Sequence, residues 1–200
     1  YGTALRISVE DNDVEGQLRS LNNLGGVKCA TGRPNESLDD YRRALELSAS
    51  SGTRLLEPVL LNNIGVAYRK AGEPGRGLQY LTAALEKNTS LDDQEGIASN
   101  LTNLGAAHEA LGETSLALDA YERALAIDEQ IENLDGQAAN LDHLAVLREA
   151  QRDYERAHQL FVRAFKINRG IGNNRRAAAS QEGIRRLSKL LGLSDGFGDS

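Results

Sequence analysis

The chain has 200 residues, of which 40% are hydrophobic and 26% charged, with one cysteine and no methionine or tryptophan. One cysteine excludes a disulfide framework and a cysteine-rich zinc site, and the net charge of −6 argues against nucleic-acid binding by the chain as a whole. No run of 18 uninterrupted apolar residues marks a membrane span, so we expect no membrane association and a cytoplasmic location.

A 40-residue repeat organises the chain. A block of two polar residues, one large aliphatic residue and one small residue recurs at 22–25 (NNLG), 62–65 (NNIG), 102–105 (TNLG) and, in weakened form, 142–145 (DHLA). Other columns keep the same register: leucines at 21, 61, 101 and 141, alanines at 44, 84, 124 and 164, and glycines at 32, 72 and 112, until Arg152 breaks the glycine series. So many columns in step indicate a repeat architecture.

The register predicts the elements in chain order. Tyr1 aligns with Tyr41 and Tyr121, so residues 1–17 are expected to be a partial repeat that holds only a second helix. Full repeats are expected at 18–57, 58–97, 98–137 and 138–175, because their apolar residues recur at three- and four-residue steps. Each would contain a helix, a tight turn at the glycine, a second helix and a longer connection such as residues 132–135. The helix pairs would span about 18–50, 58–90, 98–131 and 138–171.

The chain is expected to end in a terminal helix at 176–191 and a disordered tail at 192–200, which lacks periodicity. Small residues such as Gly65 and Gly77 recur where paired helices would approach closely. A lone helix pair cannot bury both of its faces, so neighbouring pairs must stack. The sequence therefore predicts an all-α solenoid.

The pattern resembles the tetratricopeptide repeat. The resemblance lies in Leu101, Leu104-Gly105, His108, Ala117, Tyr121 and Ala124. The closing proline is missing, and the period is 40 rather than the usual 34, with the six additional residues expected between the units. This version is similar to the long-repeat group that includes Pins-type adaptors, kinesin light chains and bacterial signalling arrays. The resemblance implies antiparallel helix pairs that form a right-handed superhelix.

The resemblance also implies that the first helix of each pair lines a concave groove that binds a peptide. The candidate contacts that it places there are Arg19, Asn22, Asn23, Asn62, Asn63, Val66, Arg69, Lys70, Asn103, Ala106, His143 and Val146.

Three of these candidates, Asn23, Asn63 and Asn103, stand 40 residues apart. Their amides could hold a peptide backbone, because an amide both donates and accepts hydrogen bonds. Alternatively, they satisfy neighbouring helices and fix the register between repeats. On the peptide interpretation, replacing all three with Ala is expected to leave melting nearly unchanged.

Motifs that carry catalysis or bind a cofactor are not found in the sequence. The three histidines lack metal-site spacing, and Cys29, which is expected on the groove face, has no basic pair near it in the sequence to lower its pKa. Phosphate-binding glycine loops, serine-hydrolase elbows and His-Glu-x-x-His helices are missing. We therefore predict a non-enzymatic protein with no catalytic residue, cofactor or metal.

Charge is distributed unevenly along the chain. Residues 1–162 hold 15 basic and 26 acidic side chains, whereas residues 163–189 hold 8 basic and 1 acidic. This basic segment could solvate the end of the array, dock on an acidic surface or, with the least support, bind phosphate-rich ligands.

The leading hypothesis for function is a protein-interaction scaffold that binds a partner peptide in the groove. One alternative is the sensor or autoinhibitory region of a larger signalling ATPase or transcriptional regulator. Another is an array that self-assembles into a homo-oligomer through its terminal helices.

Overall fold

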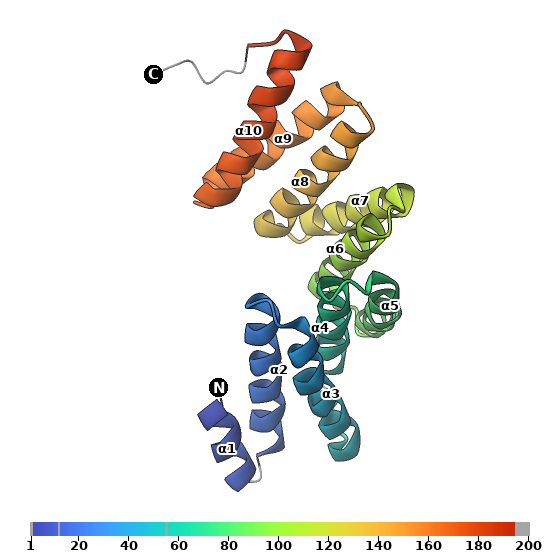
Figure 1. The fold of residues 1–200 in the computed structure, drawn as a ribbon, viewed down its shortest axis with the longest axis vertical. Coiled ribbons are helices and arrows are strands. Elements are labelled where there is room, and N and C mark those ends of the chain that lie inside the picture. The colour runs from blue at the N-terminus through green and yellow to red at the C-terminus, as the bar shows by residue number, and fades with distance from the viewer. Residues whose placement is uncertain (1, 12, 55, 195–200) are drawn as a thin grey trace. The chain divides into compact units, whose positions relative to one another are not determined.

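The computed structural model describes residues 2–11, 13–54 and 56–194. Tyr1 and residues 195–200 of the expected tail lie outside these described residues. Within them the chain forms ten α-helices and no strand, as predicted. The helices are α1 (Gly2–Glu10), α2 (Val14–Ala30), α3 (Pro34–Ser51), α4 (Glu57–Lys70), α5 (Pro74–Ser90), α6 (Gln94–Ala110), α7 (Thr114–Gln130), α8 (Leu134–Ala150), α9 (Tyr154–Gly170) and α10 (Asn174–Leu191) (Figure 1).

The helices belong to two compact units, each described by itself. Unit 1 is Tyr1–Glu113 and unit 2 is Thr114–Ser200. In unit 1, each helix from α1 to α5 contacts the next one along the chain, and α4 also contacts α2 and α6. In unit 2, α8 contacts α7 and α9, and α9 contacts α10. Each unit is thus a stack of helices in which contacts join near neighbours, as in a solenoid.

Most helices begin 20 residues apart, at 14, 34, 74, 94, 114, 134, 154 and 174. A helix of 17 residues followed by a turn of three accounts for half of the 40-residue period. The predicted long connection at 132–135 is therefore wrong, because α8 already begins at Leu134. The additional residues of this long repeat lengthen the helices rather than the loops. The exception is α4, which begins at Glu57 rather than at position 54.

Side-chain caps explain the early helix starts. Asp93 accepts a hydrogen bond from the backbone N–H of Gly96, and Asn133 accepts one from that of Gly136. These bonds satisfy amides that lack a partner within the helix. The same cap is formed by Asp13, Asp153 and Asn173.

The turns share one backbone conformation. A residue with positive φ recurs every 20 residues, and most of these are glycines. Arg152, which breaks the predicted glycine series, keeps the conformation with φ of 64°. The full set is Gly32, Gly52, Gly72, Asp92, Gly112, Glu132, Arg152, Gly172 and Gly192.

The core of unit 1 confirms the predicted close approach of paired helices. Leu60, Ile64 and Leu81 are fully buried between helices. Gly65 of α4 faces Gly77 of α5, and a Cβ atom added to Gly77 would lie 2.7 Å from the carbonyl oxygen of Gly65. Only glycine allows these two backbones to approach so closely.

Unit 2 builds its core in the same way with different residues. Phe161, Ile184 and Leu187 form one buried cluster together with Ala145 and Ala157. Here α9 supplies the large ring, and Gly183 of α10 makes room for it, since a Cβ atom at 183 would lie 2.8 Å from the Phe161 ring.

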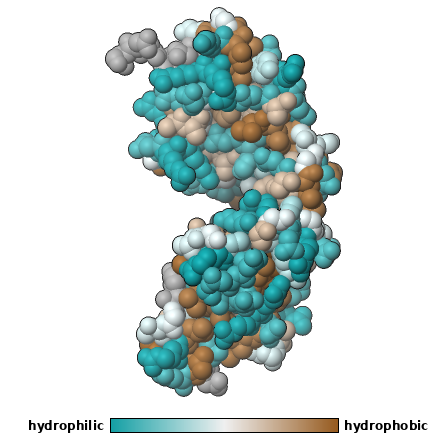
Figure 2. Space-filling model, in the orientation of Figure 1, coloured by the Kyte–Doolittle hydropathy of each residue, from teal (hydrophilic) through white to brown (hydrophobic). Residues whose placement is uncertain are grey.

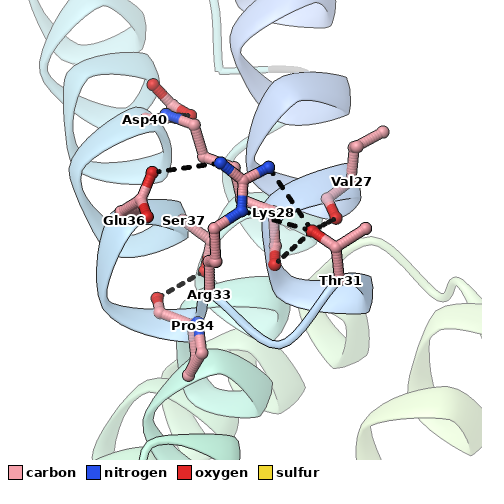
Figure 3. A network of polar contacts seen from close by, with 8 residues as sticks. All are labelled: Val27, Lys28, Thr31, Arg33, Pro34, Glu36, Ser37 and Asp40. Carbon is pink, nitrogen blue, oxygen red and sulfur yellow. Dashed lines mark hydrogen bonds and ion pairs between the residues drawn. The ribbon is translucent and has the colours of Figure 1, made fainter.

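A polar network ties α2 to α3 in unit 1 (Figure 3). Lys28 Nζ lies 2.6 Å from Oδ2 of Asp40, whose side chain is almost fully buried. One repeat later the same two positions are Tyr68 and Tyr80, whose rings stack with centroids 5.4 Å apart. The repeat geometry thus accepts either an ion pair or an aromatic pair at this contact.

None of the helices in the described part of the chain combines the length and apolarity needed to cross a bilayer.

Candidate peptide-binding face

The twelve predicted contacts all lie on the first helices of the repeats. We define the first-helix face as the side of α2, α4 and α6 in unit 1, and of α8 in unit 2, that carries the predicted contacts. Four of the twelve, Arg19, Asn23, Lys70 and Val146, are exposed, and the other eight are half-buried. Hydrophilic residues dominate the visible surface of each unit, with apolar residues scattered among them (Figure 2).

Amide side chains connect neighbouring first helices in unit 1. Asn63 Nδ2 donates to Oδ1 of Asn22 over 2.9 Å, joining α4 to α2. Asn103 Nδ2 donates to Oδ1 of Asn62 over 2.9 Å, joining α6 to α4. These bonds match the alternative in which the amides fix the register. Because Asn63 and Asn103 each form a bond between repeats, we now expect their replacement by alanine to lower the melting temperature, which differs from the expectation under the peptide interpretation.

A second polar layer lies beneath this row, and the sequence analysis missed it. Asn100 is buried, donates to Asn62 Oδ1 over 2.9 Å, and accepts from Asn88 Nδ2 over 2.6 Å. In unit 2, buried Asn140 donates to Oδ2 of buried Asp128 over 2.9 Å. The sequence does contain a signal for this layer, because a polar residue recurs every 40 residues on the inner side of a helix. These columns are Ser48, Asn88, Asp128 and Asn168, and Asn100, Asn140 and Ser180.

Unit 2 replaces the amide of Asn62 with the carboxyl of Asp142. Ser180 Oγ donates to Asp142 Oδ1 over 2.8 Å, and Asn168 Nδ2 lies 3.4 Å from Oδ2. Burial raises the pKa of Asp142 above its ordinary value, although the bonds from Ser180 and Asn168 oppose this shift. The neighbouring His143 stacks on Tyr121, with ring centroids 4.6 Å apart and planes 5° from parallel.

The charged and apolar candidates differ in their surroundings. Arg19 forms an ion pair with Glu15 one turn earlier on α2. Arg69 is half-buried, and its Nε atom is shielded from solvent without a hydrogen-bond acceptor. Val66 packs against the unit 1 core, whereas Val146 is 49% exposed on α8. The first-helix face therefore presents amides, small apolar groups and one arginine whose Nε atom is shielded from solvent without an acceptor.

Cys29 does not lie on the groove face, where it was expected. Its side chain is buried in the unit 1 core rather than on the groove face. Burial, together with the nearby Cys29 and Asp40, raises the pKa of Tyr41 to about 12. Among the described residues, no group of three or more His, Cys, Asp or Glu side chains could hold a metal ion.

Much of the basic segment is engaged within unit 2. Arg163 Nη2 lies 2.7 Å from Glu129 Oε1, and Arg186 binds Glu149 through two hydrogen bonds. The Arg169 guanidinium lies 5.7 Å from the centroid of the Phe165 ring. These three arginines thus form contacts with side chains of unit 2 itself.

Comparisons with known proteins agree with this architecture. A search of curated protein sequences finds no significant match. Among solved structures, a putative kinesin light chain from Podosopora anserina is 18% identical with a TM-score of 0.70, covering 88% of this chain and 87% of its own. BtubC from P. vanneervenii is 17% identical with a TM-score of 0.65, covering 100% and 89%.

A larger protein contains a similar array. The chain matches a STAND protein with a tetratricopeptide repeat sensor from Pyrococcus horikoshii at 14% identity and a TM-score of 0.75, covering 88% of this chain and 29% of that one. At these identities the likeness shows a shared fold. The sequence model of the tetratricopeptide repeat matches residues 16–87, 56–130 and 96–170. With three overlapping matches over most of its length, the chain belongs to the tetratricopeptide repeat family.

Proposed function

We propose that the first-helix face binds a segment of a partner protein and that the chain acts as a non-catalytic interaction scaffold. The observation that carries the proposal is the amide row across α2, α4 and α6. An amide offers two N–H groups and two acceptor lone pairs. The bond from Asn103 to Asn62 uses one N–H group of Asn103, whose side chain stays half-exposed. Exposed Asn23 forms no hydrogen bond to the described part of the chain.

The spacing of the row suits an extended segment that crosses the helices. Packed helices lie about 8–10 Å apart, and an extended chain advances roughly 3.3 Å per residue. Such a segment would meet an amide about every third residue. The bonds between repeats hold the amides in place before a partner arrives, which lowers the ordering cost of binding. Val59 is 44% exposed and lies one turn before Asn62 and Asn63 on the same side of α4, so it adds apolar area to the face.

Two variants test the proposal without breaking a bond between repeats. Peptides would be selected from a random library displayed on phage, and their Kd measured by fluorescence anisotropy. We expect Asn23→Ala and Val59→Asp each to weaken binding about tenfold, equivalent to about 1.4 kcal/mol.

Leu116→Asp is the matched control. Leu116 is 52% exposed and, like Val59, is the third residue of its helix, but it lies on α7, a second helix. We expect it to leave binding unchanged. The proposal fails if the selected peptides bind Asn23→Ala and Val59→Asp as tightly as the wild type. It also fails if Leu116→Asp weakens their binding as much as the two face variants do.

A further inference from the structure

Arg69 has no carboxylate partner in the described part of the chain, although its side chain is half-buried. It is half-buried on α4, and its Nε atom is shielded from solvent with no acceptor in reach. None of the ion pairs in the described part of the chain involves Arg69, whereas nearby Arg76 is paired with Glu73 over 2.6 Å. A shielded guanidinium N–H group without an acceptor is unfavourable, and native structures rarely keep one without a reason.

Unit 2 shows what occupies the corresponding place two repeats later. There, Arg186 of α10 donates from Nε to Glu149 Oε1 over 2.8 Å and from Nη2 to Oε2 over 2.7 Å. This bidentate pair connects two neighbouring first helices. Eighty residues earlier, position 149 corresponds to Arg69, and position 186 corresponds to Ala106 on α6.

An equivalent hydrogen bond confirms that the two helix pairs share one register. Asn100 of α6 donates to Asn62 of α4 over 2.9 Å. Eighty residues later, Ser180 of α10 donates to Asp142 of α8 over 2.8 Å. In unit 1, therefore, a guanidinium stands where unit 2 has a carboxylate, and a methyl group stands where unit 2 has the partner side chain. The α4–α6 contact thus lacks an acid opposite Arg69.

We propose that Arg69 binds the side-chain carboxylate of an Asp or Glu in the partner segment, over the contact between α4 and α6. The inference rests on the proposed function and names the chemistry that this part of the face selects. The planar guanidinium fork matches a carboxylate. The small Ala106 leaves space opposite the fork, and the adjoining exposed Lys70 adds positive charge. The partner is thus a protein segment with an acidic residue placed where it meets α4 and α6.

The first test supplies the missing carboxylate from within the chain. Ala106→Glu places an acid opposite Arg69, as Glu149 lies opposite Arg186 with the charges exchanged. We expect its Tm to exceed that of the matched Ala106→Gln variant by about 2–4 °C, and the difference to vanish when Arg69→Gln is added. If Ala106→Glu melts no higher than Ala106→Gln, or keeps its gain without Arg69, no carboxylate is accepted at this place and the proposal is overturned.

The second test uses the peptides selected on phage. We expect them to contain an Asp or Glu whose replacement by Asn or Gln weakens binding at least tenfold, as does Arg69→Gln, with no further loss when the two changes are combined. Ala106→Glu is expected to weaken the same acidic peptides by competing for Arg69. Circular dichroism would confirm that each variant is folded.

The two proposals fail in different ways. Peptides that depend on Asn23 and Val59 but tolerate Arg69→Gln would overturn the acidic site and leave the binding face intact. Peptides that depend on none of these residues would overturn both proposals.

Discussion

At the scale of single residues, the turns contain side chains where the backbone favours glycine. Glu132 and Arg152 have φ of 56° and 64°, the left-handed conformation that costs a residue with a Cβ atom about 1–2 kcal/mol. We expect Glu132→Gly and Arg152→Gly each to raise the free energy of unfolding by about 1 kcal/mol, and Tm by about 2–4 °C. Thermal denaturation followed by circular dichroism measures the shift.

The reverse change gives the control in the same unit. Gly172 has φ of 74° and belongs to the same 20-residue series. Gly172→Arg should lower the free energy of unfolding by about 1 kcal/mol. Stabilities that stay unchanged in all three variants would mean that the turns carry no strain.

Asp142 gives a residue-scale prediction about pH. Burial raises its pKa in the folded state, so folding favours the protonated form. Its contribution to stability is then greatest below the unfolded pKa, about 3.9, and is lost as the pH rises through the raised folded pKa. Asn62 occupies the same repeat position with a neutral amide.

We therefore expect Asp142→Asn to melt at a higher temperature than the wild type at pH 7. An asparagine oxygen can still accept the hydrogen bond from Ser180. The advantage should shrink as the pH falls toward 4 and below, where the wild-type carboxyl is protonated. Melting curves across this range measure it, and an advantage that does not vary with pH would contradict the assignment.

At the scale of helices, close packing of α4 on α5 depends on a pair of glycines. A Cβ atom at Gly77 would collide with the backbone of Gly65, whereas one at Gly75, in the first turn of α5, would meet nothing within 4 Å. Overpacking costs typically about 1–3 kcal/mol, and alanine regains up to about 1 kcal/mol in helix propensity. Gly77→Ala should therefore destabilise the chain by about 1–2 kcal/mol.

Gly75→Ala makes the same chemical change on the same helix. Without a collision, we expect it to stabilise the chain by up to about 1 kcal/mol. Urea denaturation of the two variants separates packing from propensity. Equal effects of the two substitutions would show that the helices can move apart at no cost.

The sequence predicted the helices better than their ends. Leu101 and Leu141 recur in step and are buried as their column requires. The predicted helix starts were too late because the apolar pattern gives no information about the first turn. The start of a helix is set there by a polar cap residue. Asp93 and Asn133 stand 40 residues apart, so this signal was present in the sequence.

The candidate site could be predicted only as a set of positions. Repeat register placed Asn63 and Asn103 on the first-helix face, but an amide that fixes register and one that binds a peptide have the same sequence pattern. Their bonds to Asn22 and Asn62 depend on the distance between helices, which the repeat pattern does not specify. The unmatched position of Arg69 likewise becomes visible only beside the pair of Glu149 and Arg186.

At the scale of the whole molecule, stability should be distributed along the chain. Contacts in each unit join neighbouring helices, so the free energy is approximately a sum over helices and their interfaces. Tyr41 belongs to a buried cluster of unit 1, and Phe161 belongs to one of unit 2. A local loss of packing is thus expected to open the nearby helices first.

Two variants test this distribution by hydrogen exchange and mass spectrometry. Phe161→Ala removes a buried ring at a cost of about 3–5 kcal/mol, and we expect amide protection to fall in α8, α9 and α10 while α2 to α5 stay protected. Tyr41→Ala should produce the reverse pattern, with loss in α2, α3 and α4. An equal loss of protection across both units in either variant would show that the chain unfolds as a single cooperative body, because local opening leaves the more distant helices protected.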